Sequence, residues 1–281
     1  MNIARIFHGG RTGSVPKLPL IVIVLWILVA LAAPWIAPWS QREIIGDPYG
    51  VPQHGAILGM DYFGRDMLSR IIFGSRTTIV LAVAANLIAS GVGITIGFFS
   101  AYAKGWIDEA IGRVMDGLMA LPTIMFALVC VSALGSSEMV LVCTVGLIES
   151  VRVYRVARAV GLDNLARDYV DLAHLRGESV FWILFREALP NAYPPLLTDF
   201  GVRFAATVML LSAVSFLGLG VQPPAADWGM MVRENLAGLR LGSIAAVFPA
   251  LAIFSVTFSA NKLVDWFLRR SQRDISTEFL A

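Results

Sequence analysis

The side chains best suited to catalysis or metal binding are few and scattered along this sequence. The three histidines, His8, His54 and His174, lie in three different polar segments, without a cysteine or second histidine at metal-ligand spacing. The two cysteines, Cys130 and Cys143, lie within apolar runs, where cysteine packs as a small hydrophobic residue. No zinc-protease motif and no nucleophile–histidine–acid arrangement occurs. We therefore expect no catalytic residue, no metal site and no bound cofactor.

The sequence also contains no phosphate-binding loop of the form Gly-x4-Gly-Lys followed by Ser or Thr. A process driven by ATP would need another polypeptide to bind ATP and magnesium. A few charges do lie within apolar runs, where charged side chains are costly and usually paired or functional. Asp199 and Arg203 share one helix face, which favours either an ion pair or a path-lining role, and Asp116 is expected as an interhelical acceptor.

The elements that must position these groups are apolar runs of membrane-spanning length. Hydrophobic residues make up 57% of the chain, charged residues 15%, and the mean hydropathy is +0.72. Roughly 20 helical residues cross the apolar core of a bilayer. Runs of this kind lie at 18–36, 77–102, 114–134, from 139 onward, 196–219 and 241–268. We expect an all-α polytopic membrane protein with six spans, Pro122 within the third and Pro249 kinking the sixth.

Three of these spans carry further signals. The first follows three basic residues and could be read as a signal peptide, but its length favours a retained helix. The second contains Gly93 and Gly97, which are four residues apart and would allow close approach by another helix. The fourth has no clear end, because Glu149, Arg152 and Arg155 interrupt its apolar character.

The distribution of Lys and Arg predicts the orientation of the chain. With the N-terminus inside, the inner segments hold 15 of these residues and the outer segments hold six. Segments rich in Lys and Arg remain on the cytoplasmic side of bacterial membranes. We therefore expect both termini in the cytoplasm and the segment 38–75 outside.

The polar segment 165–190 carries the strongest functional motif. An acid at Asp171 is followed by Ala173, by Gly177 and then by Leu189-Pro190. This pattern resembles the EAA loop of ABC importer permeases, which in that family docks into a cleft of the ATPase subunit. Leu172 and Glu187 depart from the family pattern, but the acid, the glycine and the proline are present.

The resemblance extends along the chain in the expected order. The run from Leu58 to Arg70, with Gly74 and Arg76, resembles the first-loop signature of C-type permeases for dipeptides, oligopeptides or nickel. Asp116 with Ala120-Leu121-Pro122, and the run from Ser215 to Gly229, resemble later motifs of the same subfamily. The third-span and post-fifth-span motifs thus flank the EAA-like segment as they do in that subfamily.

The resemblance implies a type I ABC importer permease of the bacterial inner membrane. Residues 1–75 would form the N-terminal tail, first span and outer loop, residues 76–270 a five-helix core, and residues 271–281 a cytoplasmic tail. Its partners would be a homologous permease, two ATPase subunits, an extracytoplasmic solute-binding protein and the lipid bilayer, but no nucleic acid. Candidates for outer contacts are Asp61, Gly64, Arg65, Asp66 and Trp228. For Arg65 and Asp66 the alternative role is to hold the loop together, and for Trp228 it is to anchor an interfacial helix.

Two other classes of function remain open from the sequence. A secondary transporter driven by an ion gradient would commonly show internal repeats around a central site, and no convincing repeat is visible. An intramembrane hydrolase would need catalytic residues that do not group in this sequence. The favoured function is the transmembrane subunit of an ATP-driven importer of peptides or a related small solute.

Overall fold

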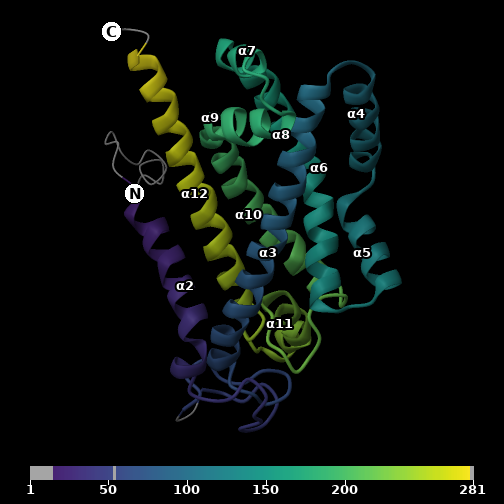
Figure 1. Ribbon diagram of the computed structural model, residues 1–281. Coiled ribbons are helices and arrows are strands. Elements are labelled where there is room, and N and C mark those ends of the chain that lie inside the picture. Colours follow the sequence, from purple (N-terminus) through teal and green to yellow (C-terminus); the bar gives the residue numbers. More distant parts are fainter. Residues whose placement is uncertain (1–14, 53–54, 279–281) are drawn as a thin grey trace.

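The computed structural model describes residues 15–52 and 55–278, and these fold as helices joined by short connections (Figure 1). Two isolated bridges, Ile44–Arg65 and Met60–Asp66, are the only strand-like pairing among them. The helices are α2 (Lys17–Ile36), α3 (Met67–Ala103), α4 (Gly105–Met119), α5 (Thr123–Leu134), α6 (Glu138–Leu165), α7 (Asp168–Leu175), α8 (Val180–Trp182), the π-helix η1 (Ile183–Ala188), α9 (Leu189–Asn191), α10 (Tyr193–Phe216), α11 (Trp228–Asn235), the 3-10 helix η2 (Leu236–Leu241) and α12 (Val247–Glu278).

Four of these helices, α2, α3, α10 and α12, are long and apolar enough to cross a membrane. The pair α4 and α5 adds a fifth candidate if it is counted as one broken span. Helix α6 has 28 residues, but Glu149, Arg152 and Arg155 within it make it less apolar than the others. The all-α membrane fold is thus confirmed, and the count of six spans stays a prediction.

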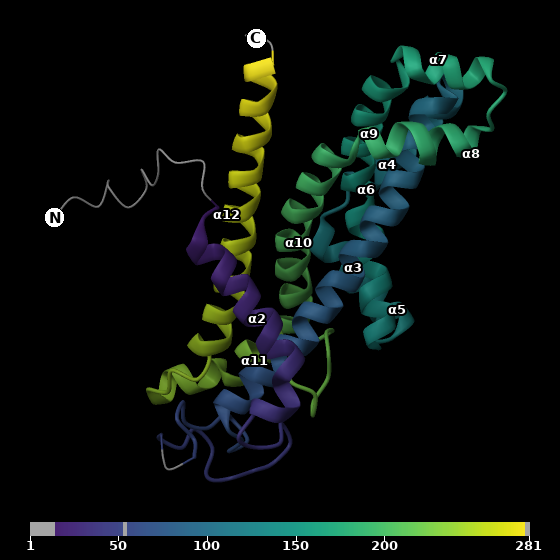
Figure 2. The same cartoon turned by 60° about the vertical axis from the view of Figure 1, so that its left-hand side comes forward.

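The helices define two ends of the molecule (Figures 1 and 2). The short helices α7 to α9 and the last turns of α12 lie toward one end, called here the α7 end, and α2 begins beside the middle of α12. The segment between α2 and α3 lies with α11 at the opposite end, called the α11 end. This arrangement agrees with the expected alternation of the connections, while their assignment to inside and outside stays a prediction.

The expected third span is not one continuous helix. Helices α4 and α5 meet at an angle of 88° around residues 120–122. A proline disfavours helical backbone in the preceding residue and cannot donate the next helical hydrogen bond. Pro122 lies at this break. It has a non-helical ψ of 115° and occupies the N-cap position of α5.

We had expected Pro249 to kink the sixth span, and this prediction is wrong. Helix α12 begins at Val247, so Pro249 lies in its first turn, where backbone N–H groups lack helical acceptors and proline is tolerated. Helix α3 also differs from expectation, because it begins at Met67 rather than near residue 77. Asp66 caps it by accepting a 2.8 Å hydrogen bond from the Ser69 backbone N–H.

The core is centred on α3, which packs most extensively against α6. A Cβ atom added at Gly93 would lie 2.6 Å from Val153 Cβ, and one at Gly97 would lie 2.8 Å from Ala157 Cβ. The two glycines therefore allow the close helix approach that their spacing predicted. Helix α2 packs on α12, where Trp26 Nε1 donates a 2.8 Å hydrogen bond to Ser255 Oγ.

Candidate functional site

The predicted coupling segment, residues 165–190, forms a hairpin of short helices at the α7 end. Helix α7 ends at a turn in which Gly177 has a φ of +75° and faces open space. This left-handed conformation favours glycine over all other residues. The chain then returns through α8, η1 and α9 into α10.

The predicted residues of this segment do not all face the same way. Asp171 and Pro190 are exposed and Leu189 is half-buried, but Ala173 is fully buried. Ala173 packs in a cluster with Phe98 of α3 and Ala157 of α6. Its small side chain thus lets α7 rest on the bundle, so within the predicted coupling segment Ala173 lies on the anchored side.

Arg176 holds the two arms of the hairpin together. Its Nη2 donates a 2.9 Å hydrogen bond to Glu187 Oε1, and its guanidinium lies 5.5 Å from the ring centre of Trp182. Glu187, which departs from the family pattern, therefore closes the hairpin through an ion pair. On the other side, His174 stacks on Tyr102 of α3 with 5.7 Å between ring centres.

The π-helix η1 accommodates Pro190. Within an α-helix Pro190 would lack an N–H donor and its ring would clash with the carbonyl four residues earlier. Here the backbone widens at Ile183–Ala188, and the Leu189 N–H bonds to the carbonyl of Leu184, five residues back. Asn191 Nδ2 then donates a 2.7 Å hydrogen bond to the Glu187 carbonyl, so the side chain after the proline binds the widened turn.

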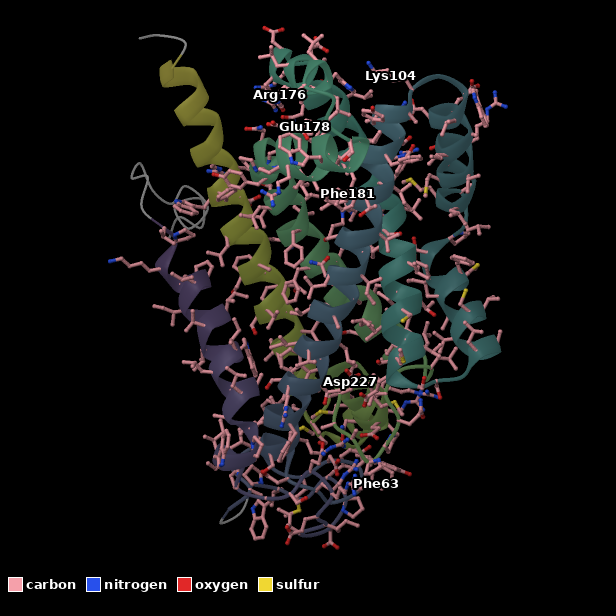
Figure 3. The ribbon with its side chains drawn as sticks, viewed as in Figure 1. Phe63, Lys104, Arg176, Glu178, Phe181 and Asp227 are labelled. Atoms are coloured by element: carbon pink, nitrogen blue, oxygen red, sulfur yellow. The ribbon has the colours of Figure 1, made fainter. Side chains whose placement is uncertain are left out.

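Large apolar side chains of the hairpin are exposed on both α7 and α8. Leu172 is 57% exposed, Leu175 is 85% exposed and Phe181 is 72% exposed. Figure 3 shows Phe181 with Arg176 and Glu178 at this end of the molecule. Large apolar side chains that stand together in solvent indicate an interaction surface. We call Leu172, Leu175 and Phe181 the hairpin surface.

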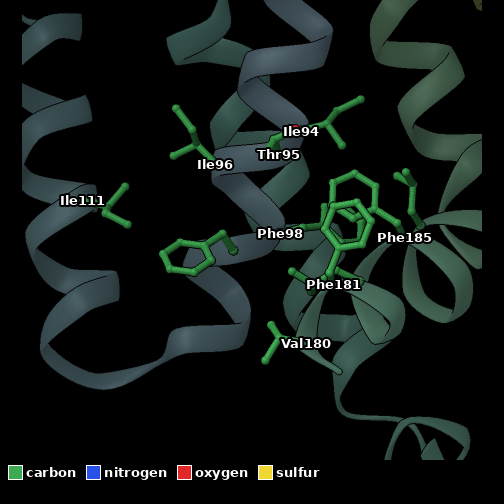
Figure 4. Close-up of a pocket in the computed structure, with 11 residues that line it drawn as sticks. Ile94, Thr95, Ile96, Phe98, Ile111, Val180, Phe181 and Phe185 are labelled. Atoms are coloured by element: carbon green, nitrogen blue, oxygen red, sulfur yellow. The ribbon is translucent and has the colours of Figure 1, made fainter. Parts of the chain in front are cut away.

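A crevice of about 560 Å³ lies between this hairpin and helices α3 and α4 (Figure 4). Its walls include Phe98 and Phe99 of α3, Ile111 of α4 and Phe181 and Phe185 of the hairpin. No charged side chain lines it. Such a crevice offers nothing that could orient a polar solute.

The opposite end holds a buried charge cluster of Asp61, Arg65, Arg70 and Glu234. Arg65 Nε donates a 2.8 Å hydrogen bond to Asp61 Oδ2, and Arg70 Nη1 donates one of 2.6 Å to Glu234 Oε2. Arg70 also bonds to Asp61. The cluster joins the first loop to α3 and α11 with two charges of each sign.

The residues predicted as possible outer contacts are buried within this subunit. Asp61, Arg65, Asp66 and Trp228 are all within the buried class. Trp228 Nε1 donates a 3.1 Å hydrogen bond to the Ile71 carbonyl. A Cβ atom at Gly64, whose φ is +76°, would lie 2.0 Å from the Gly46 carbonyl oxygen. These residues hold the loop together, which was the alternative role for Arg65 and Asp66.

Asp227 fixes α11 beneath this loop. Its carboxylate accepts hydrogen bonds from the Met230 backbone N–H at 3.0 Å and from Thr78 Oγ1 at 2.9 Å. Burial raises the pKa of the Asp227 carboxyl, although these hydrogen bonds act in the opposite direction. Figure 3 shows Asp227 at the α11 end, with Phe63 beyond it.

The charges within the helices form a second network. Arg203 Nε donates a 3.2 Å hydrogen bond to Asp199 Oδ1, as their spacing predicted. Buried Glu149 of α6 lies beside this pair, with its Oε2 at 3.9 Å from Arg203 Nη1. Arg152 Nη1 donates to Glu149 Oε1 at 3.3 Å. The network therefore joins α6 to α10.

Asp116 takes part in a separate and exposed contact. Its Oδ1 accepts a 2.7 Å hydrogen bond from Arg155 Nη2, which connects α4 to α6. The contact agrees with the expected interhelical acceptor. Within residues 15–52 and 55–278, no group of three His, Cys, Asp or Glu side chains is arranged to hold a metal ion.

Sequence reasoning missed Glu234 and the position of Glu149. Glu234 lies 164 residues after Arg70, so no local spacing connects the two. Glu149 was noticed as an interruption of a span, and its burial between two arginines is a property of the packed helices. A charged residue within an apolar run was the one available signal.

Comparisons with known proteins agree with this geometry. Residues 93–276 match the family described as binding-protein-dependent transport system inner membrane component. The chain is 31% identical over 245 residues to the glutathione transport system permease protein GsiD of Pectobacterium atrosepticum, covering 86% of this chain and 81% of that protein. It is 30% identical over 253 residues to the di/tripeptide transport system permease protein DppC of Pseudomonas aeruginosa, covering 88% and 84%.

The fold is also similar to that of a solved amino acid ABC transporter, with a TM-score of 0.50 and 18% sequence identity. That similarity covers 72% of this chain and 94% of the other. At this identity it supports the helical arrangement alone. The chain belongs to the family of binding-protein-dependent transport system inner membrane components, as a multi-pass permease subunit of a bacterial ABC importer.

Proposed function

We propose that this permease imports di- or oligopeptides, or a related small solute, together with a homologous permease, two ATPase subunits and an extracytoplasmic solute-binding protein. The α7 end would lie in the cytoplasm, in agreement with the excess of Lys and Arg there. The α11 end would face the solute-binding protein. The substrate class is supported by the relatives described as glutathione and di/tripeptide permeases.

The observation that carries the mechanism is the hairpin surface. Leu172, Leu175 and Phe181 are exposed on a hairpin whose other side is anchored by buried Ala173 and Ile183. Exposed apolar side chains on an anchored hairpin can enter a cleft on a partner. Because the hairpin is packed on the helices, a motion of the partner would then be transmitted to them. The ATPase subunits would grip this hairpin, and their closure around ATP would shift the permease between inward- and outward-facing states.

The charges within the helices are then candidates for path-lining or structural roles. Asp199 and Arg203 satisfy each other, and this pairing supports a structural role. Asp116 pairs with Arg155 at an exposed position and supports the joint between α4 and α6. None of these groups is needed for covalent chemistry, which the ATPase subunits would perform.

Gly177→Asp tests the coupling role. The substitution strains a turn at φ +75° and adds a charge beside the hairpin surface. We expect ATPase subunits to co-purify about tenfold less with the variant, and uptake to fall in parallel, because interface contacts of this kind contribute about 1.4 kcal/mol or more. The amount of variant in the membrane should be unchanged.

Gly242→Asp is the matched control. Gly242 has a φ of +80° and also faces open space, so the substitution causes similar strain, but it lies between η2 and α12. We expect this variant to keep its ATPase subunits. Normal association and uptake in Gly177→Asp, or equal losses in both variants, would contradict the proposed coupling.

A further inference from the structure

A second cavity, of about 270 Å³, lies where α4 and α5 meet α6. Most of its wall is apolar, with Phe126 and Cys130 from α5 and Leu147 from α6. The exceptions are two threonines, Thr123 and Thr144, and one charged side chain, Arg152. The cavity thus differs from the larger crevice near the hairpin, which contains no charge.

Arg152 is held in place at this cavity from two sides. Its Nη2 donates a 3.0 Å hydrogen bond to Thr123 Oγ1, at the start of α5, and its Nη1 donates to Glu149 Oε1 at 3.3 Å. The side chain is still 40% exposed. A guanidinium has five N–H donors, so these two contacts fix its plane and leave donors for a ligand.

The charge of Arg152 is less well compensated than that of its neighbour Arg203. Arg203 has Asp199 at 3.2 Å and Glu149 at 3.9 Å. Arg152 shares the same Glu149, and the 3.3 Å contact is its one ion pair within the described chain. A guanidinium in a mostly apolar cavity favours an additional anion, and its planar fork matches a carboxylate.

We propose that Arg152, held by Thr123 and Glu149, forms a subsite that binds a carboxylate of the transported solute. The inference rests on the proposed function, because peptides and glutathione carry a free carboxylate at neutral pH. Ligand pockets typically have volumes of about 300–1,000 Å³. The cavity of about 270 Å³ is smaller than this range, so it would hold one end of a peptide and not the whole molecule.

The break between α4 and α5 lies directly beside this subsite. Thr123 is the first residue of α5, directly after the 88° bend. A shift of α5 relative to α6 would separate Thr123 from Arg152 and change the grip on the carboxylate. Binding would then be transient, as transport requires.

The test uses the complete importer, with its ATPase subunits and its solute-binding protein, reconstituted in lipid vesicles. Uptake of L-alanyl-L-alanine and ATP hydrolysis are measured together for wild type and Arg152→Gln. We expect uptake to fall about tenfold, the effect of one charge-assisted contact, while hydrolysis stays within about twofold. Fewer peptides would therefore enter for each ATP consumed.

Two further variants separate binding from folding. Arg152→Lys keeps the charge without the fork, and its uptake should lie within about threefold of wild type because charge provides part of the contact. Arg155→Gln removes the same charge one turn along α6. Arg155 does not line the cavity, and its ion-pair partner Asp116 is exposed. This variant should therefore import as many peptides for each ATP as wild type.

Unchanged uptake in Arg152→Gln, or a parallel loss of uptake and hydrolysis, would overturn the subsite. A lysine variant as weak as the glutamine variant would also contradict binding by charge. If wild type imports neither alanyl-alanine nor glutathione, the proposed substrate class itself is wrong. The two failures are therefore distinguishable.

Discussion

At the α11 end of the molecule, four charged side chains are buried among themselves, whereas at the α7 end, large apolar side chains stand in solvent. Burying charges is costly and is tolerated only where they are paired. Exposing apolar surface is also costly, unless a partner covers it. The α11 end thus pairs its charges within the chain, although Arg70 Nη2 and Glu234 Oε1 are buried without a hydrogen-bond partner, while the α7 end leaves apolar side chains that a partner could cover.

The difference fits the proposed coupling, in which one end of the subunit holds its shape while the other end meets the ATPase subunits. The first loop is joined to α11 by the charge cluster and by the hydrogen bond from the Tyr62 N–H to Asn235 Oδ1 at 2.9 Å. The hairpin is anchored to the bundle by buried Ala173 and Ile183, and it also carries the exposed side chains of the hairpin surface. An α11 end held by internal pairs and an α7 end with a free apolar surface would suit the bistable transporter proposed above.

Arg70→Ala should cause the largest effect, because it leaves two buried acids, Asp61 and Glu234, with Arg65 as their one remaining basic partner in the cluster. Removing one member of a buried ion pair typically costs about 3–5 kcal/mol. The expected result is a loss of this size in the free energy of unfolding of the detergent-solubilised protein. Arg113→Ala, which breaks an exposed pair with Glu109, should change stability by less than about 1 kcal/mol. Equal losses in the two variants would contradict the claim that the buried charge cluster stabilises the fold more than an exposed ion pair does.

Ile183→Ala should weaken the anchored side of the hairpin. Ile183 is fully buried in the cluster with Phe98 and Leu196. Such a truncation costs about 2–5 kcal/mol in a packed core. We expect lower thermal stability together with faster proteolysis within residues 168–191. A stable variant with normal protection would show that the hairpin does not depend on this contact.

Phe181→Ala should have the smallest effect on the isolated subunit. The side chain is exposed, so stability should change by less than about 0.5 kcal/mol. Association with the ATPase subunits should nevertheless weaken, because a large aromatic residue contributes strongly when a partner buries it. A pull-down compared with the unfolding curve measures both. Loss of stability without loss of association would reverse the contrast between the two sides of the hairpin.

Much of the function could be predicted from local patterns. The match of residues 93–276 to the importer family favours the importer over the ion-gradient transporter and the intramembrane hydrolase. The spacing of Asp171, Gly177 and Pro190 was visible because coupling helices are continuous in sequence. The roles of Ala173 and Trp228 were not, because burial depends on what lies against a side chain.

What the sequence by itself determined is the class of the molecule: the run lengths, the Lys and Arg asymmetry and the close approach allowed by Gly93 and Gly97. The run lengths and the glycine spacing depend on neighbours within a few turns of one helix, and the Lys and Arg asymmetry depends only on counts along the sequence. Only the tertiary structure decided that Arg70 meets Glu234, that Pro122 separates two helices, and that Arg152 lines a cavity. The reason is physical, since pairing and burial depend on helices that are distant in the chain and adjacent only after packing.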